Sequence, residues 1–332
     1  MAADDEEVII GANEEEYEYT SKLLNTLVDE NNQYNYVLKK WIFDWMQQNN
    51  IHGETFWKAM VWNDRCGFFL CDERTMKEFL CEARFAEDFG RFEGHGEALD
   101  IFISVIENSR RQCWGSVDWN YIALNPHSNA ISIIEKNMDK MTNEYKWHSL
   151  SKNKNAIHII EKNIDKIDEF NEWSELCKNP SALEIIKKYK NSGKFENNDL
   201  CRNENPEILK LIDLEGLSDN DWGDIFSNPG ARFIIEKNMD KLNDTNRYCL
   251  FQNPNVVDII EKELEKGLDD KCMESLCGNI NASHIIEKYI EKLNENAICS
   301  LNTNVGAIHL LEKNPQLVNS TILQNPAIFE AK

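Results

Sequence analysis

The sequence has little that would suit a membrane or a nucleic acid. No apolar run approaches the roughly 20 residues that a membrane span needs; the densest stretch, Cys66 to Leu70, is five residues long and includes a glycine. Basic residues are in the minority, since 36 Lys+Arg face 58 Asp+Glu and leave a net charge of −22. A nucleic-acid partner requires a basic face that displaces counterions from phosphates, so we expect none.

The sequence also lacks a recognisable catalytic motif. It contains no phosphate-binding Gly-Lys-Ser/Thr loop, no GxSxG elbow and no HExxH helix. Five residues resemble metal ligands or a Cys–His nucleophile pair by type: His52, Cys66, Cys71, Cys81 and His95. Their spacing is irregular, whereas zinc ligands usually come as close pairs. Buried thiols are the favoured interpretation, so we predict no enzyme, no metal site and no cofactor.

Cysteine usage and the N-terminus point to a reducing compartment. None of the ten cysteines forms a CxxC pair, and a chain of 332 residues does not need disulfides. Eight acids and no base lie between Asp4 and Glu18, whereas an export signal starts with basic residues and an apolar core. A solvated acidic arm over residues 1–20 is the simpler interpretation. The alternative is an arm that docks on a basic neighbour.

From about residue 118 onward the sequence repeats itself. An apolar pair, usually followed by Glu-Lys, recurs with spacings of 26, 26, 26, 23, 25, 26 and 25 residues. The pairs are Ile133-Ile134, Ile159-Ile160, Ile185-Ile186, Leu211-Ile212, Ile234-Ile235, Ile259-Ile260, Ile285-Ile286 and Leu310-Leu311, and a truncated copy follows at residues 321–328. Regular spacing over eight copies indicates stacked units that bury their apolar faces against one another.

Each copy is predicted to form two helices. A large apolar residue stands six residues before a recurrent Asn in several copies and another stands three before it, as Trp222 and Ile225 do for Asn228. This spacing is typical of one buried stripe on a two-turn helix. We expect the Asn to cap a second helix of about 12 residues, with the frequent following proline at its first position. No segment shows sustained alternation, so strands are not expected.

This pattern resembles repeats of uncharacterised proteins from large nucleocytoplasmic DNA viruses of the mimivirus and chlorovirus type. The consensus W-x-x-L-x-x-N-P-x-A-I-x-I-I-E-K-N stands nearly whole at residues 173–188 and 222–238. The resemblance covers about two thirds of the chain and brings no catalytic residues with it. It implies a non-enzymatic viral structural or scaffolding protein, for example a minor virion or capsid component, located in the virion or the host cytoplasm.

Residues 21–117 contain no proline and are predicted to be a separate helical domain. Apolar spacing indicates helices at Leu23–Val28, at Val37–Trp45, from Thr75 through Phe85 and from Ala98 to Ile106. Five of the nine tryptophans lie before residue 118. We favour a core that caps the first repeat, and a docking surface rich in tryptophan is the alternative.

The sequence therefore predicts an all-α protein: an arm over 1–20, a helical domain over 21–117, and an α-solenoid of about eight and a half two-helix repeats over 118–332. The position just before each apolar pair accepts every kind of side chain, so we expect it to be exposed and to bind partner proteins. Its candidates are His158, Glu184, Lys210, Phe233, Asp258, His284 and His309. The partners would be viral coat or scaffold proteins; the alternative is a host protein captured by an adaptor, for example for a ubiquitin ligase.

Overall fold

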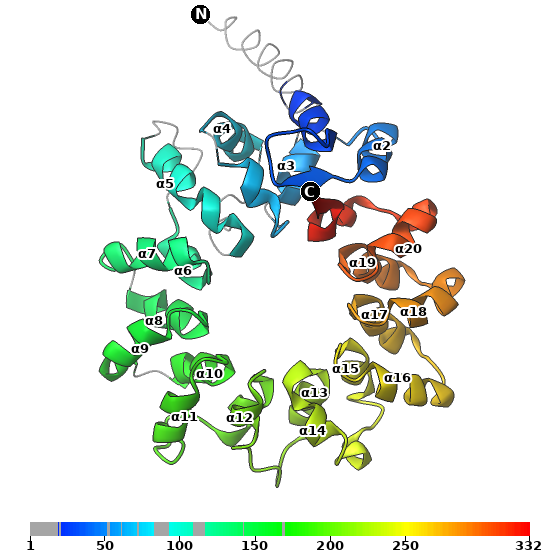
Figure 1. Ribbon diagram of the computed structural model, residues 1–332. Helices are drawn as coiled ribbons and strands as arrows, with labels where there is room; N and C mark the ends of the chain where they lie inside the picture. Colours follow the sequence, from blue (N-terminus) through cyan, green and yellow to red (C-terminus); the bar gives the residue numbers. More distant parts are fainter. Residues whose placement is uncertain are drawn as a thin grey trace, which may run out of the picture. The chain divides into compact units, whose positions relative to one another are not determined.

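The chain is mostly helical, and its helices follow one another in pairs (Figure 1). The structure is a computed structural model that describes residues 19, 21–51, 54–60, 62–71, 73–82, 93–108, 117–141, 143–167 and 170–332. The chain divides into two compact units, one formed by residues 1–130 and 320–332 and the other by residues 131–319. The predicted arm over 1–20 lies almost wholly outside the described residues.

The second unit is a row of helix pairs. Its first helices are α8 (Asn143–Lys152), α10 (Phe170–Lys178), η6 (Asn197–Arg202), α13 (Asp219–Ser227), α15 (Arg247–Gln252), α17 (Asp270–Gly278) and α19 (Glu295–Thr303). Its second helices are α9 (Ile157–Lys162), α11 (Leu183–Tyr189), α12 (Pro206–Leu209), α14 (Arg232–Ile235), α16 (Val257–Glu263), α18 (Ser283–Ile286) and α20 (Ile308–Lys313). Short 3-10 turns accompany the second helices: η5 (Ile164–Lys166), η7 (Pro229–Ala231), η8 (Met239–Lys241), η9 (Leu264–Lys266), η10 (Glu287–Lys292) and η11 (Pro315–Leu317).

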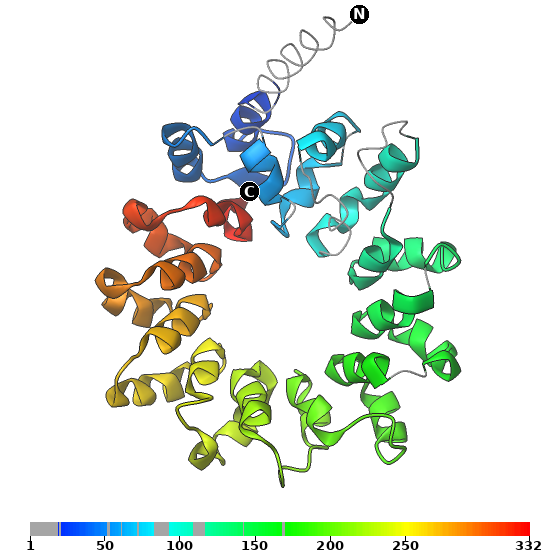
Figure 2. The same cartoon turned by 180° about the vertical axis from the view of Figure 1, so that it is seen from behind.

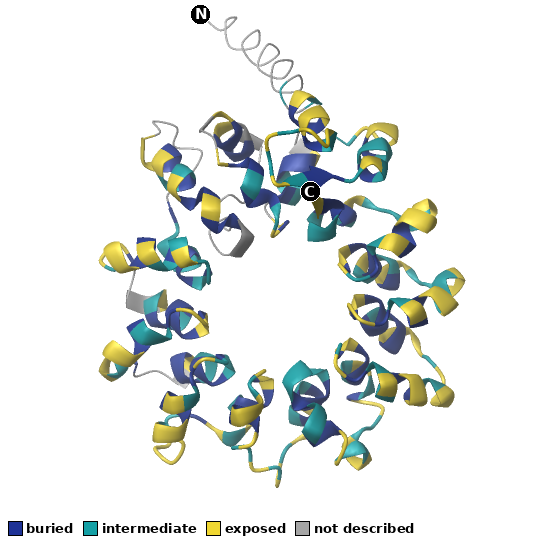
Figure 3. Cartoon of the chain, viewed as in Figure 1, coloured by how far each residue is buried: buried dark blue, intermediate teal, exposed yellow. Residues whose placement is uncertain are grey.

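Consecutive first helices pack against each other along this unit, from α8 to α19. The first helices lie on one side of the row and the second helices on the other, as Figure 1 and Figure 2 show from opposite directions. Figure 3 shows that the outer ends of the second helices carry much of the exposed surface. Two helices per copy are confirmed, but the second is an α-helix of four to seven residues from α9 onward, shorter than the 12 predicted.

Helix α13 shows how the sequence builds a first helix. Ser218 caps its N-terminus, and Asp221 bonds back to the Ser218 backbone in a reciprocal capping box. Trp222 and Ile225 then fall on one buried stripe, as predicted. The equivalent residues three before the recurrent Asn are all fully buried: Ile122, Leu150, Leu176, Ile225, Leu250, Leu276 and Leu301.

The recurrent Asn has a different role from the predicted one. In most copies of the second unit it ends the first helix, and the α-helix that follows starts about four residues later after an alanine or valine. Its side-chain oxygen accepts the backbone N–H two residues on, as Asn253 does from Asn255 at 3.0 Å. This Asx turn frees the amide NH₂ to point toward the preceding repeat.

These NH₂ groups form a ladder through the second unit. Each donates to the backbone oxygen of the previous ladder Asn and to that of the residue two before it; Asn253 bonds to Asn228 at 2.7 Å and to Phe226 at 3.0 Å. The ladder residues with both bonds are Asn179, Asn203, Asn228, Asn253, Asn279 and Asn304. All are buried. The first-helix C-termini thus gain donors for carbonyls that have no partner within the helix.

A second set of contacts runs beside the ladder, two residues farther along each copy. Here Asn255 donates to the Pro229 oxygen at 2.9 Å, and Asn205 and Asn281 make the same bond to their preceding copies. Two copies carry glycine instead, and an added Cβ at Gly306 would lie 1.8 Å from the Ile280 oxygen. The backbones of adjacent copies therefore approach too closely there for any side chain.

The first unit joins segments from both ends of the sequence. Its elements are β1 (Tyr36–Leu38), α2 (Lys40–Gln48), α3 (Glu54–Met60), η1 (Cys66–Phe69), α4 (Glu73–Glu82), η3 (Glu93–Ala98), α5 (Leu99–Asn108), α6 (Trp119–Leu124), η12 (Ser320–Gln324), η13 (Pro326–Ile328) and β2 (Phe329–Ala331); α7 (Ser128–Lys136) crosses the boundary. Residues 21–28 are also helical, and Leu23, Leu24 and Leu27 are buried. The predicted helices near residues 75 and 98 are confirmed as α4 and α5, as far as they are described.

The expectation of no strands was wrong. Strands β1 and β2 pair antiparallel, with Leu38 opposite Phe329, and Lys39 adds an ion pair with Glu330 at 2.7 Å. Val37 and Leu38 therefore belong to a strand, and α2 begins only at Lys40. Each strand has three residues, which is too short to show alternation, and the partner lies about 290 residues away.

Asn63 extends the ladder pattern into the first unit. Its buried NH₂ donates to the backbone oxygens of Leu323 at 2.8 Å and Asn325 at 3.2 Å, and its side-chain oxygen accepts from Arg65. Helix α3 correspondingly packs on η12. Trp57, six residues before Asn63, is fully buried, as the repeat pattern requires. The N-terminal segment thus contains a divergent copy of the repeat, which the sequence analysis missed.

Candidate functional site

The predicted partner-binding position lies at the start of the second helices. Glu184, Lys210, Asp258, His284 and His309 are exposed, while His158 and Phe233 are half-buried. None of the seven is enclosed in the core, so all are accessible from solvent. Their role in binding a partner stays a prediction.

Several of these residues contact the preceding copy. The Nε2 atom of His158 lies 2.9 Å from Glu135 Oε1, and that of His284 lies 3.2 Å from Glu261 Oε1. Both glutamates come from the recurrent Glu-Lys that follows each apolar pair. The pairs are solvent-exposed, so each contributes at most about 1 kcal/mol to stability. The position therefore forms lateral contacts between neighbouring second helices as well as an open surface.

Arg232 makes the most extensive of these lateral contacts. Its guanidinium binds Asp258 through two hydrogen bonds of 2.8 Å, and it also donates to Glu236 and to the Asn255 backbone oxygen. The hydrogen bonds from Arg232 lower the pKa of Asp258. A planar guanidinium suits this paired geometry, which a lysine could not reproduce.

The apolar pair predicted for the fourth copy, Leu211-Ile212, was wrong. Its buried pair is Ile208 and Leu209, whereas Leu211 and Ile212 are half-buried. Lys210 therefore follows the pair instead of preceding it, and it bonds to Glu207 at 2.5 Å. The error arose because Glu-Lys is missing from this copy, so the anchor was placed on the next apolar pair.

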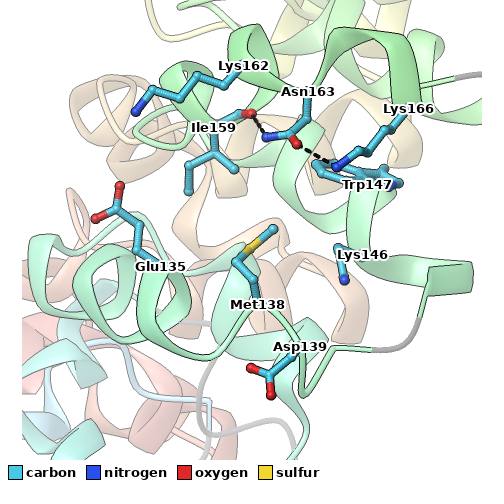
Figure 4. A pocket seen from close by; sticks show the side chains of 9 residues that line it. All are labelled: Glu135, Met138, Asp139, Lys146, Trp147, Ile159, Lys162, Asn163 and Lys166. Atoms are coloured by element: carbon cyan, nitrogen blue, oxygen red, sulfur yellow. Dashed lines mark hydrogen bonds between the residues drawn. The ribbon is translucent and has the colours of Figure 1, made fainter.

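A pocket of about 500 Å³ opens between copies one and two of the second unit (Figure 4). Trp147 of α8 and Ile159 of α9 form its apolar floor together with Met138. The Trp147 and Ile159 side chains are largely buried. Lys146, Lys162 and Lys166 lie around it, with Glu135 and Asp139 on the side of the preceding copy. The Lys166 amine donates to Asn163 Oδ1 at 2.9 Å and lies 5.8 Å from the centre of the Trp147 ring. This pocket was not predicted from the sequence.

Comparison with protein-family models, curated proteins and solved structures finds no match. The function must therefore be argued from this chain alone.

The suspected metal or nucleophile cluster is only partly described. His52 and the Cys81 side chain lie outside the described residues, and Cys71 is exposed. Cys66 and His95 do meet, with Sγ 3.3 Å from Nε2, and both are fully buried. Across the ranges that the structure describes, no group of three or more His, Cys, Asp or Glu residues is arranged to hold a metal ion.

Cys66 and His95 are poorly arranged for nucleophilic chemistry. Nε2 of His95 also lies 3.0 Å from the Asn63 backbone oxygen, an acceptor, so we assign the proton to Nε2. A protonated Nε2 cannot take a proton from the thiol. Burial, with a further contribution from Asp64, raises the pKa of Cys66 well above its usual value, which favours the unreactive thiol.

The other buried thiols are similar. Burial raises the pKa of Cys201 and of Cys277 to about 12, so both remain protonated at neutral pH.

None of the described helices is long and apolar enough to cross a membrane.

Proposed function

We propose that the chain is a non-enzymatic scaffold that holds partner proteins on an α-solenoid of two-helix repeats. The observation that carries this proposal is the asparagine ladder, which stacks copies through the backbone and leaves the second-helix surfaces free to vary. Repeat arrays of this kind offer extended surfaces on which partners bind.

The test compares two triple variants of the full chain as bait for its partners. Replacing His158, His284 and His309 with alanine should remove partner proteins while the chain stays folded, with a loss of at most about 1 kcal/mol for each His–Glu pair removed. Replacing the exposed lysines Lys237, Lys262 and Lys288 with alanine is the control, because each follows the apolar pair of its copy instead of preceding it. If both variants retain the same identified partners as the wild type, the predicted position is not the binding face.

We further propose that these partners belong to a virus particle and that the chain is a minor virion or capsid component. The support is the resemblance of residues 173–188 and 222–238 to repeats of large DNA viruses. Proteomic analysis of purified virions from the source should find the protein at a fixed ratio to the coat protein. Its absence from such particles would refute the proposal.

A cytosolic adaptor is the second candidate function. Its support is the division into two units, because one unit can hold a target while the other contacts a second partner. Recovery of ubiquitin-ligase subunits with the bait would favour the adaptor, whereas recovery of coat proteins would favour the virion component.

A further inference from the structure

The pocket over Trp147 corresponds to a space that an aromatic side chain fills in the next copy. Trp147 and Trp173 hold the same position, six residues before their ladder asparagines. Tyr189 packs on Trp173 with the ring centres 5.0 Å apart, and Phe195 stacks on it at 6.1 Å. The position of Tyr189, ten residues after the ladder Asn, is Asn163 in the preceding copy. Its short amide leaves the space that the tyrosine ring occupies one repeat later.

Lysines outnumber acids in the segment that forms this pocket. Seven lysines and only four acids lie between residues 136 and 166, although the whole chain carries a net charge of −22. Lys162 and Lys166 are exposed at the pocket, and Lys146 is half-buried. Within the described part of the chain, no ion pair occupies Lys146 or Lys162. The pocket therefore offers lysine amines to a negatively charged ligand.

Two carboxylates also line the pocket. Glu135 is paired with His158, and Figure 4 shows Glu135 on the same side as Lys162 and Asp139 on the same side as Lys146. Like charges disfavour an acidic ligand close to either carboxylate. The flanking acids of a ligand would therefore bind the lysine amines themselves, with an apolar group over the Trp147 ring and Ile159.

We propose that this pocket binds an acidic peptide segment of a partner protein through one apolar side chain flanked by carboxylates. The proposal rests on the scaffold function above and specifies one partner chemistry for it. The apolar side chain fills the volume that Tyr189 takes in the next copy, and the carboxylates bind the lysine amines. Exposed charge pairs are weakened by salt, so binding falls as the salt concentration rises.

The test is a titration of the full chain into a fluorescein-labelled peptide that has one leucine flanked by glutamates, followed by anisotropy. Asn163→Tyr copies the neighbouring repeat and should weaken binding about tenfold or more, because it displaces the buried leucine. Lys162→Glu should also weaken binding. Lys188→Glu is its matched control, since Lys188 holds the same position one copy later, and it should leave the affinity unchanged.

Three results would overturn the proposal: equal affinity of Asn163→Tyr and wild type, equal loss from Lys162→Glu and Lys188→Glu, or equal binding of a peptide with alanine in place of leucine. A circular-dichroism melt shows whether Asn163→Tyr is folded, and the lysine pair gives an independent answer if it is not. If the peptide titration fails but the full-chain bait still retains partner proteins, the pocket proposal is rejected and the scaffold proposal stands. If the wild-type bait retains no partner protein, the scaffold proposal itself is rejected.

Discussion

Replacing Asn253 with alanine should destabilise the second unit far more than the same change at Asn255. Asn253 is fully buried and makes three hydrogen bonds through its side chain: two as a donor to Asn228 and Phe226, and one as an acceptor from the Asn255 backbone. Asn255 is exposed, and its amide makes one bond, to the Pro229 oxygen. The two residues are of one type and both link adjacent copies, so they form a matched pair.

The expected magnitude follows from the number of bonds and their burial. Each buried bond contributes about 1 kcal/mol net, and a carbonyl left without its donor adds a desolvation cost, so Asn253→Ala should cost about 3 to 5 kcal/mol. Water can replace the single exposed bond of Asn255, so its loss should cost about 0.5 to 1 kcal/mol.

Urea unfolding followed by circular dichroism gives the global change in free energy, and amide hydrogen exchange locates it. Because each copy contacts only its neighbours, the protection should fall most in α13 to α17 and least at the distant copies. Equal costs for the two variants, or a loss of protection spread evenly over the unit, would refute the view that the buried ladder holds the copies together.

Three further predictions follow from the same structure. Gly306→Ala should destabilise by about 2 kcal/mol or more in urea unfolding, because its Cβ would collide with a backbone oxygen, whereas Gly278→Ala, with open space around it, should be neutral or slightly stabilising. Asn63→Ala should raise the exchange rate of amides in residues 322–331 more than in α5, and equal rates would show that the bonds of Asn63 do not hold this segment. In a thiol-labelling assay at pH 8, the exposed Cys71 should react at once. Cys277, with a pKa of about 12 and only about one thiolate in ten thousand, should react only on unfolding. Rapid labelling of Cys277 would contradict its burial.

Much of the local structure could be predicted from the sequence because it depends on local spacing. The stripe of Trp222 and Ile225 identifies a first helix from residues three apart, and the recurrence of that stripe gives the pairing of helices along the chain. The shorter second helices were not predicted, because the apolar spacing continues through the 3-10 turn after the α-helix, as at Ile160 and Ile164.

The rest depended on contacts between copies. The capping preference of asparagine explains its acceptor oxygen, but the direction of the NH₂ is set by the preceding repeat, which no local rule describes. The tyrosine that fills the equivalent space one repeat later is visible when copies are compared, since Asn163 stands where the next copy has Tyr189. The divergent copy around Asn63 carried the same signal, with Trp57 and Met60 six and three residues before it.

The pairing of β1 with β2 has a consequence for how the chain acquires its structure during synthesis. Leu38 leaves the ribosome 291 residues before Phe329, its partner. At about 5 to 20 residues per second, Leu38 and Asn63 wait roughly 15 to 60 s for the backbone groups that they bind. The unit that contains Leu38 and Asn63 is therefore completed only after Phe329 has been synthesised. A ribosome stalled anywhere in the repeats would hold a chain in which β1 still lacks β2. Such an unpaired strand edge can bind chaperones or aggregate.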